Sequence, residues 1–548
     1  LPPTPTEEET SDILSALQST LSSLLPYTEF LSINRYGSHV LQALLSRLPD
    51  LGGIIEESSP IYTHVVSIAS TILPSLLEYA THVCGSHVLR TLICVLGGCK
   101  PEEILPKRGK KGKHKHDGSR QADTTSKSYP LNVTLTTSGS SHLRPALTSL
   151  VTALITKSSK KDMGYMQYLT CSPDAGPVIT TMIRVCAIVD EADGNVGGVR
   201  NTKTPLSKDA NKTSRTGEVM AGDYPTVKKG GAGEMLVRDV LKADDKGIVD
   251  EVVYGLAGER LGSRVLECCL EVYPEASVIV WNTMKGKVEE YVKDEFGNFI
   301  VQSLCTHKRE GGKEVVDELL PLVRNKTLLE KRRTGVLFRL VQACTREGFR
   351  EDKRVQEDVY NAIFGNISVG ALLGLELPEK EGGRITIDVN AGRTIFWCLN
   401  FSEVWANKVL EGIKGLSNAE IMALCKDGMG SKVVIDGMLE SKVEEIRKSG
   451  ASFLYDVIEG GGEWLGLGCD RIGHWTVEKV WERVEMDQKM AINMKLLEGQ
   501  RRLEGCSMGR SVIAACAIEA FLEGKSNFED AVNKKLRLKD FVEEIGGG

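Results

Sequence analysis

One short pattern recurs along the chain in a constant frame: a small residue, two variable residues, two apolar residues and a third variable residue. The first and third variable residues lie four apart, as Asn298 and Gln302 do, so about 40° separates them around a helix. They therefore form a side-by-side polar pair that can donate and accept hydrogen bonds. The apolar residues, such as Val40 and Leu41, fall on the opposite side and are expected to pack. The second variable residue points along the surface toward the neighbouring copy.

Six copies carry this frame clearly and a seventh closes the series. Their variable residues are Ser38, His39 and Gln42; Ser86, His87 and Arg90; Ser263, Arg264 and Glu267; Asn298, Phe299 and Gln302; Ser431, Lys432 and Ile435; His474, Trp475 and Glu478; and Arg510. Weaker copies begin at Ala175, Gly335 and Gly392. A single copy would indicate only an amphipathic helix with a solvated face. Several copies that vary at the same three places favour a repeat with functional side chains.

The spacing of the copies predicts stacked helical repeats. Ser263 and Asn298 are 35 residues apart, and His474 and Arg510 are 36 apart. A repeat of that length is expected to be a helix pair that cannot bury its apolar face alone, so the copies stack into an all-α, curved solenoid. Partner helices are expected at 11–25, 276–292 and 313–323. Ten repeats are supported, and an eleventh at 406–411 stays open because Asn407 lies only 24 residues before Ser431.

Composition is consistent with one long helical array. The 548 residues are 41% hydrophobic but only 6% aromatic, which suits helices better than strands. The longest apolar runs, near 92–96 and 512–518, are too short to span a bilayer, so no membrane association is expected. The chain begins Leu1-Pro2-Pro3, which suggests trimming at the N-terminus.

Signals for catalysis, metals and cofactors are poor. The 14 cysteines include no C-x-x-C pair, which favours reduced, buried thiols over disulfides or zinc. The glycine clusters match no phosphate-binding loop, because the chain has no G-x-x-x-x-G-K-[ST] motif. The sequence therefore predicts neither an enzyme nor a bound cofactor or metal.

Two segments interrupt the array. Residues 107–140 hold the basic run Lys107–His116 and a Ser/Thr-rich tract, and residues 190–232 are rich in Gly, Asp, Thr and Lys. Both are expected to be disordered insertions. The basic run is either a nuclear or nucleolar address, a loose RNA contact or a solvated charge run. The expected organisation is a tail (1–10), repeats (11–106), the first insertion, a degenerate repeat (141–189), the second insertion, repeats (233–528) and a tail (529–548).

At these residues the chain resembles the Pumilio, or PUF, family of RNA-binding solenoids. The segment Asp294–Gln302 is close to that family's typical repeat, and repeats of this kind read one base each. Degenerate copies, long insertions and a count above eight make the chain most similar to the nucleolar protein nine family of small-ribosomal-subunit biogenesis factors. The resemblance covers roughly residues 12–528 outside the insertions.

The resemblance implies a role for each variable residue. The first and third bond a base edge and the second stacks between bases, so Asn298 and Gln302 with Phe299 suit uracil. Ser263 and Glu267 suit guanine, with Arg264 lying flat on a base. In the same way Ser38 and Gln42 suit adenine, with His39 as the stacking residue. RNA runs antiparallel to such repeats, so the repeats of Asn298 and Ser263 should read 5′-U-G-3′.

Other repeats depart from the family pattern. Arg90 could reach a phosphate instead of a base edge, while His87 is favoured as a stacking residue. Ile435 cannot read a base edge, and repeats beginning at 175 and 392 have lost the polar pair. Trp475 is either a stacking platform or a buried packing residue. So many altered repeats imply loose sequence preference with backbone contacts.

The sequence therefore predicts an RNA-binding protein, with an armadillo- or HEAT-like protein scaffold as the alternative. The resemblance implies pre-ribosomal RNA near the 3′ end of the small-subunit sequence, where the protein would shield a processing site. It implies a nucleolar or nuclear monomer that meets assembly factors or a processing nuclease. The net charge of −6 requires a locally basic inner face, for which the candidates are Arg90, Arg264, Lys308, Arg339, Lys432 and Arg510.

Overall fold

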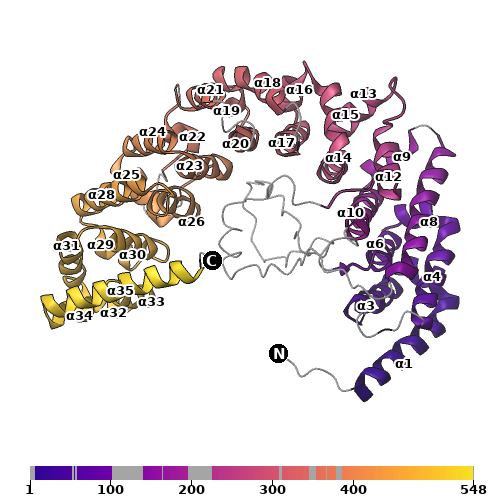
Figure 1. Ribbon diagram of the computed structural model, residues 1–548, viewed down its shortest axis with the longest axis horizontal. Coiled ribbons are helices and arrows are strands. Elements are labelled where there is room, and N and C mark those ends of the chain that lie inside the picture. The colour runs from indigo at the N-terminus through magenta and orange to yellow at the C-terminus, as the bar shows by residue number, and fades with distance from the viewer. Residues whose placement is uncertain are drawn as a thin grey trace. The chain divides into compact units, whose positions relative to one another are not determined.

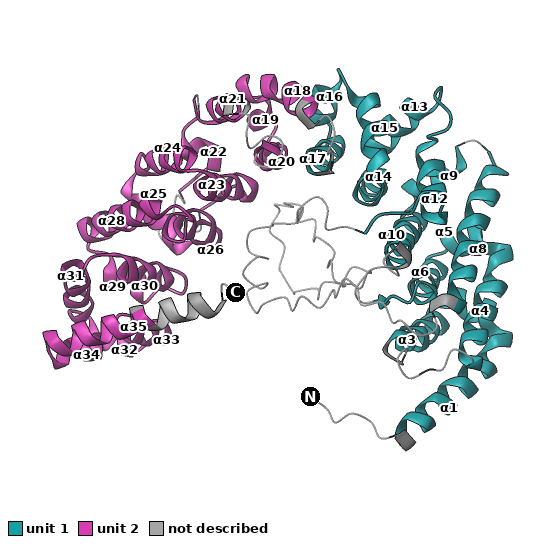
Figure 2. Ribbon diagram, viewed as in Figure 1, with its two compact units in different colours: residues 1–312 teal, residues 313–548 magenta. Residues whose placement is uncertain are grey.

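The computed structural model describes residues 7–51, 55, 59–101, 140–162, 164–194, 225–307, 312–344, 353–365, 367–377 and 385–546. These residues fall into two compact units, unit 1 (1–312) and unit 2 (313–548) (Figure 2). Within the described part of the chain the regular structure is helical, apart from one isolated bridge between Glu376 and Thr386. The all-α solenoid expected from the sequence is confirmed.

Unit 1 contains five repeats of three helices each, numbered 1–5 here in chain order. Their helices are α1 (Glu7–Leu24), α2 (Thr28–Ile33) and α3 (Arg35–Leu51); α4 (Pro60–Ile72), α5 (Leu76–Thr81) and α6 (Gly85–Leu96); α8 (Ser140–Ser159), α9 (Tyr165–Cys171) and α10 (Ala175–Gly194); α12 (Ala232–Leu241), α13 (Val249–Gly258) and α14 (Arg260–Val272); and α15 (Pro274–Met284), α16 (Val288–Lys293) and α17 (Gly297–His307). Short 3-10 turns, η1 (Leu25–Tyr27) and η2 (Leu73–Ser75), join first to second helices.

Unit 2 adds repeats 6–10 and a terminal helix pair. Its helices are α18 (Gly312–Arg324), α19 (Thr327–Glu330) and α20 (Thr334–Cys344); α21 (Lys353–Phe364), α22 (Val369–Leu373) and α23 (Val389–Phe401); α24 (Glu403–Lys414), α25 (Asn418–Lys426), α26 (Gly428–Gly430), the π-turn η3 (Ser431–Ile435) and α27 (Asp436–Leu439); α28 (Glu444–Gly461), α29 (Trp464–Gly468) and α30 (Gly473–Arg483); α31 (Met486–Leu497), α32 (Gln500–Glu504) and α33 (Ser507–Ala515); and finally α34 (Ile518–Glu523) and α35 (Lys525–Gly546).

Within each unit the third helices stack on one another in a continuous layer. In unit 1, α3 contacts α6, α6 contacts α10, α10 contacts α14, and α14 contacts α17. The first helices form the opposite layer, in which α1 contacts α4 and α4 contacts α8 (Figure 1). In unit 2, α20 contacts α23 and α30 contacts α33 in the same way. The recurring pattern of the sequence thus occupies one layer.

The core lies between these layers and is built from the apolar residues of the pattern. Val88, Val265 and Ile300, which share the first apolar position of the frame, are buried as that position predicts. Val40 is an exception, because it is 47% exposed although it occupies the same frame position. Its helix, α3, is the first of the stacked third helices, so it has such a neighbour on one side only.

The repeat has three helices instead of the expected pair. A single helix was expected over 276–292, but α15 ends at Met284 and α16 begins at Val288. The break occurs at Gly286, whose positive φ of 79° ends a helix at low cost for glycine. The possible eleventh repeat at 406–411 lies inside α24, the first helix of repeat 8. The described residues therefore form ten repeats.

Several expected boundaries differ from the structure. Helix α10 continues to Gly194, and the backbone N–H of Lys228 donates to Asp190 Oδ2 at 2.8 Å, so both ends of the 190–232 segment are ordered. The C-terminal boundary expected at 528 falls inside α35, and α1 begins within the expected N-terminal tail. Residues 102–139 and 195–224, including the basic run Lys107–His116, lie outside the described residues.

One stretch, Pro60–Thr81, has the length and composition of a membrane-crossing helix, with a mean hydropathy of 1.3 over its most apolar window. No stretch long enough to span a bilayer was expected from the sequence, because its uninterrupted apolar runs are shorter. The stretch is divided into α4 and α5 by the 3-10 turn at Leu73–Ser75, and α4 contacts α1 and α8. One face of α4, which includes Val65, Ile68 and Ile72, is buried in the solenoid and accounts for part of this apolar composition.

In seven repeats the small residue of the pattern is a glycine that lies against the preceding short helix: Gly37, Gly85, Gly262, Gly297, Gly430, Gly473 and Gly509. A Cβ added to Gly262 would lie 2.7 Å from Leu256 O and 3.0 Å from Leu256 Cα, both backbone atoms. We therefore expect Gly262→Ala to destabilise the fold by about 1–3 kcal/mol through overpacking. Gly255→Ala is the matched control, since nothing lies within 4 Å of a Cβ there and α13 should gain helix propensity. If thermal unfolding showed Gly255→Ala to be less stable than Gly262→Ala, the close packing of Gly262 against Leu256 would be contradicted.

Candidate functional site

The variable residues are positioned by a shared cap at the start of each third helix. Three residues before the small residue stands a side chain that accepts backbone N–H groups; Asp294 Oδ1, for example, accepts from Phe296 N at 2.8 Å and Gly297 N at 2.7 Å. Equivalent caps are Asn34, His82, Asp427 and Asp470. Asp388 caps α23 in the same way, with Ala391 as the small residue three positions later. This cap fixes which side of the helix each variable residue faces.

The first variable side chains are turned toward their own helix. Ser38, Ser86, Ser263, Asn298, Ser431 and His474 are between 2% and 7% exposed. The Ser263 hydroxyl donates to Arg260 O at 3.2 Å, and the Asn298 amide donates to Asp294 O at 3.1 Å and Glu295 O at 2.7 Å. These residues thus stabilise the first turn of the helix, and most of the surface at each repeat comes from the second and third variable residues.

The expected polar pair forms most fully in repeat 5. Gln302 Nε2 donates to Asn298 Oδ1 at 3.0 Å, so the two amides four residues apart are in direct contact. In repeat 1 the Gln42 amide instead donates to the backbone oxygen of Ser38 at 3.0 Å. Glu267 occupies the corresponding place in repeat 4 and is half-buried. Helices α14 and α17 contact each other, so the pairs of repeats 4 and 5 are neighbours in one layer.

The second variable residues provide the flat and charged surface. His39, Arg264, Lys432 and Trp475 are exposed, while His87 and Phe299 are half-buried. Trp475 is 52% exposed, with its ring 4.7 Å from the His474 ring, which excludes the buried packing role. In repeat 2, Arg90 Nη2 lies 2.5 Å from His87 Nδ1, so the cation is held beside the imidazole.

The departures from the family pattern have structural consequences. Ile435 is fully buried, in agreement with its inability to read a base. Arg510 is exposed and its Nη1 donates to Glu504 O at 3.1 Å. Glu478 Oε1 accepts from the hydroxyl of Ser511 in the next repeat at 2.8 Å. Gly176 and Gly392 leave their repeats without a polar pair, as expected from the sequence.

The candidate basic residues are only partly available for a ligand. Arg264, Lys432 and Arg510 are exposed, whereas Arg339 Nη1 donates to Gln342 Oε1 at 2.7 Å and its guanidinium lies 5.5 Å from the Phe338 ring. Lys308 lies outside the described residues. In the degenerate repeat 7, burial lowers the pKa of Arg393. The exposed candidate cations therefore lie in three separate repeats, 4, 8 and 10.

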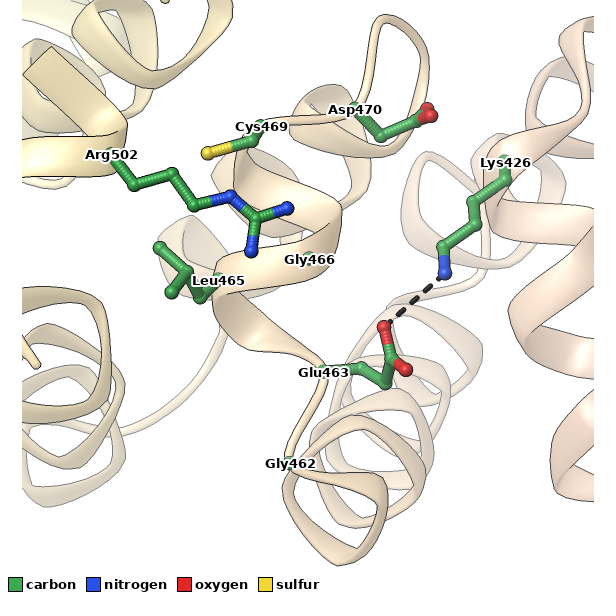
Figure 3. Close-up of a pocket in the computed structure, with 8 residues that line it drawn as sticks. All are labelled: Lys426, Gly462, Glu463, Leu465, Gly466, Cys469, Asp470 and Arg502. Atoms are coloured by element: carbon green, nitrogen blue, oxygen red, sulfur yellow. Dashed lines mark hydrogen bonds and ion pairs between the residues drawn. The ribbon is translucent and has the colours of Figure 1, made fainter. Parts of the chain in front are cut away.

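A polar cavity of about 560 Å³ opens between the cap turns of repeats 8–10 in unit 2. Figure 3 shows Lys426 and Glu463 pointing toward one another, and Lys426 Nζ lies 3.2 Å from Glu463 Oε2. Arg502 extends toward Cys469 (Figure 3). The Asp470 carboxylate accepts from the backbone N–H groups of Ile472 and Gly473, each at 2.8 Å. Lys426, Glu463 and Asp470 in the lining of this cavity thus have structural partners.

In the described part of the chain, the cysteines and acidic residues form no metal-binding cluster, and most of the thiols are buried. No cluster of three or more His, Cys, Asp or Glu residues there could hold a metal ion. Ten of the 14 cysteines are buried. Burial raises the pKa of Cys94, Cys186, Cys268 and Cys425 to about 12, which keeps these thiols protonated and unreactive.

Comparison with known proteins agrees with this geometry. Residues 52–511 match the model of the NOP9-like PUF repeat domain, and residues 30–50 match the Pumilio-family RNA binding repeat. The chain is 25% identical over 278 residues to Pumilio homolog 23 of Arabidopsis thaliana, which covers 47% of this chain and 36% of that protein. The chain thus spans little more than a third of that relative's length.

Solved structures support the same fold. The structures of APUM23–GGAUUUGACGG and APUM23–GGAAUUGACGG each match with a TM-score of 0.67 and 20% identity, over 95% of this chain and 88% of the other. These matches favour PUF repeats over the armadillo- or HEAT-like alternative.

The burial of the thiols can be tested directly. Of the 14 cysteines, only Cys84, Cys171, Cys469 and Cys506 are partly exposed. Mass spectrometry after maleimide treatment of the native protein should show modification at these four sites only, because the remaining thiols are shielded and protonated. The denatured protein, as the control, should be modified at all 14. Rapid native labelling of Cys268 or Cys398 would contradict the packing of the third helices.

Proposed function

The chain belongs to the NOP9-like PUF repeat family, and we propose that it binds single-stranded or partly structured RNA on its layer of third helices. The observation that carries this proposal is the contact between the Asn298 and Gln302 amides, next to the Ser263 and Glu267 pair on the adjoining helix. Splayed bases of single-stranded RNA offer polar edges and flat faces together. The polar pairs suit the edges, and Phe299 and Arg264 suit the faces.

The proposed preference of repeats 5 and 4 is 5′-U-G-3′. Held in place by Asn298, the Gln302 amide presents its oxygen as an acceptor and its second N–H as a donor, as the edge of uracil requires. The Glu267 carboxylate accepts from the ring N–H and the amino group of guanine. The strings GGAUUUGACGG and GGAAUUGACGG in the APUM23 structures each contain a single U-G step. This agreement supports the proposal for the present chain.

The proposed biological substrate is pre-ribosomal RNA near the 3′ end of the small-subunit sequence. Support comes from the NOP9-like family match over residues 52–511. Bound there, the solenoid would shield a processing site from a nuclease during small-subunit maturation, and its place of action would be the nucleolus or nucleus. Assembly factors of the pre-ribosome are the proposed protein partners, and the proposed oligomeric state is a monomer.

Selection from a randomised single-stranded RNA pool tests the binding proposal. We expect retained RNAs enriched in a U-G step, with an affinity that falls as salt rises because phosphate contacts release counterions. For a single strand the slope of log affinity against log salt is about −0.7 per neutralised phosphate, so about four contacts give a slope near −3. Double-stranded DNA of matched length is the control. If the protein retained no RNA, the proposal would be refuted, and the alternative of an armadillo- or HEAT-like protein scaffold would be favoured.

Glu267→Gln tests the assignment of guanine. The amide keeps one acceptor but replaces the other with a donor, which opposes the donor groups of guanine, so we expect roughly a tenfold loss of preference for G over A at that position. Fluorescence anisotropy with RNAs that differ only in this base measures the ratio. Glu275→Gln, an exposed substitution in the first helix α15, is the matched control. An unchanged ratio in Glu267→Gln would refute the assignment.

A further inference from the structure

The third helix of repeat 8 contains a π-turn at the place where other repeats carry the polar pair. In η3 (Ser431–Ile435) the backbone N–H of Asp436 donates to Ser431 O, five residues back. A regular α-helix would make this bond over four residues. The turn therefore accommodates one extra residue, and each later side chain takes the angular position of the residue before it. Single π-turns inside α-helices occur frequently at functional sites.

The burial of side chains shows the same one-residue shift. Repeats 2, 4, 5 and 9 follow a buried first variable residue with a partly exposed third one, four positions on: Arg90, Glu267, Gln302 and Glu478. In repeat 8 the residue four positions after Ser431 is Ile435, which is fully buried. The next residue, Asp436, is partly exposed, and Gly437, Met438 and Leu439 are buried again. Asp436 therefore occupies the third variable position of this repeat.

The contacts of Asp436 place it beside the neighbouring third helix. Its Oδ1 lies 2.6 Å from Lys479 Nζ, and Lys479 directly follows Glu478, the third variable residue of repeat 9. The same Nζ lies 2.9 Å from Glu440 Oε1. Lys479 thus keeps a carboxylate partner when Asp436 turns to a ligand, so a new hydrogen bond at Asp436 leaves no cation unpaired.

We infer that Asp436, displaced into the third variable position by the π-turn, is the residue of repeat 8 that recognises a base edge, and that its ligand is a guanine of single-stranded RNA. A carboxylate accepts two hydrogen bonds and donates none, which matches the adjacent ring N–H and amino group of guanine and opposes the acceptor-bearing edge of uracil. Lys432, exposed on the same helix, lies at the second variable position. This inference rests on the proposed RNA-binding function.

Base preference measured on the full chain tests the inference. Selections from a randomised RNA pool are compared for wild type, Asp436→Asn and the control Asp456→Asn, which removes the same charge from the exposed surface of α28. Asp436→Asn should lose a guanine preference at one nucleotide position by roughly tenfold, the equivalent of one charge-assisted hydrogen bond. Asp456→Asn should retain the wild-type profile. Circular dichroism and thermal unfolding verify that both variants are folded.

Two further variants separate the possible outcomes. Lys479→Met should keep the guanine preference, because the carboxylate remains; loss of that preference in Lys479→Met alone would assign the contact to the lysine and overturn the inference. Glu267→Gln serves as the internal reference. If Glu267→Gln alters the profile and Asp436→Asn does not, RNA binding stands and the role of Asp436 falls. If wild type retains no RNA, both proposals fail.

Discussion

The cap that starts each third helix is the constraint on which the candidate site depends. An oxygen or nitrogen of a capping side chain accepts the N–H groups of the first turn, while the small residue three positions later contacts the backbone of the preceding short helix. Loss of such a cap costs about 1 kcal/mol, a modest energy. The cap has a greater effect on the rotation of the helix about its axis, because the cap and the close contact of the small residue together determine which three side chains of the helix reach the surface. The same arrangement recurs in repeats whose variable residues differ completely.

This arrangement divides the work among the three variable residues. The first is buried and bonded to the helix backbone, so its chemistry stabilises the start of the helix and constrains its neighbour, as the Asn298 oxygen does by accepting from Gln302. In repeats 1 and 5 the third donates a hydrogen bond to that neighbour and is half-exposed. The second is exposed in repeats 1, 4, 8 and 9. Recognition in such a repeat depends mainly on a side chain whose orientation was fixed before any ligand arrived, which lowers the entropic cost of binding.

The sequence predicts the third helices well because their pattern combines periodicity with a fixed small residue, two independent signals. The second helices were missed, since segments of four to ten residues such as α9 and α19 are too short to show a helical period. The capping residues could have been found: an Asp or Asn precedes the small glycine by three positions at 34, 294, 427 and 470. The burial of Ser263 and Asn298 could not have been predicted. The sequence does not tell whether a serine hydroxyl or an asparagine amide bonds to its own helix backbone or faces a ligand.

Repeat 8 shows most clearly where sequence reasoning stops. Counted along a regular helix, Ile435 falls at the third variable position and the repeat has no base-reading group. The π-turn moves Ile435 into the core, where it is fully buried, and brings an acidic residue to the surface. Burial of a complete isoleucine side chain is worth about 1.5–3 kcal/mol, which can offset the poorer hydrogen-bond geometry of a single wide turn. Packing of an apolar residue thus changes which side chain is presented, so the specificity of a degenerate repeat depends on its core as well as on its surface residues.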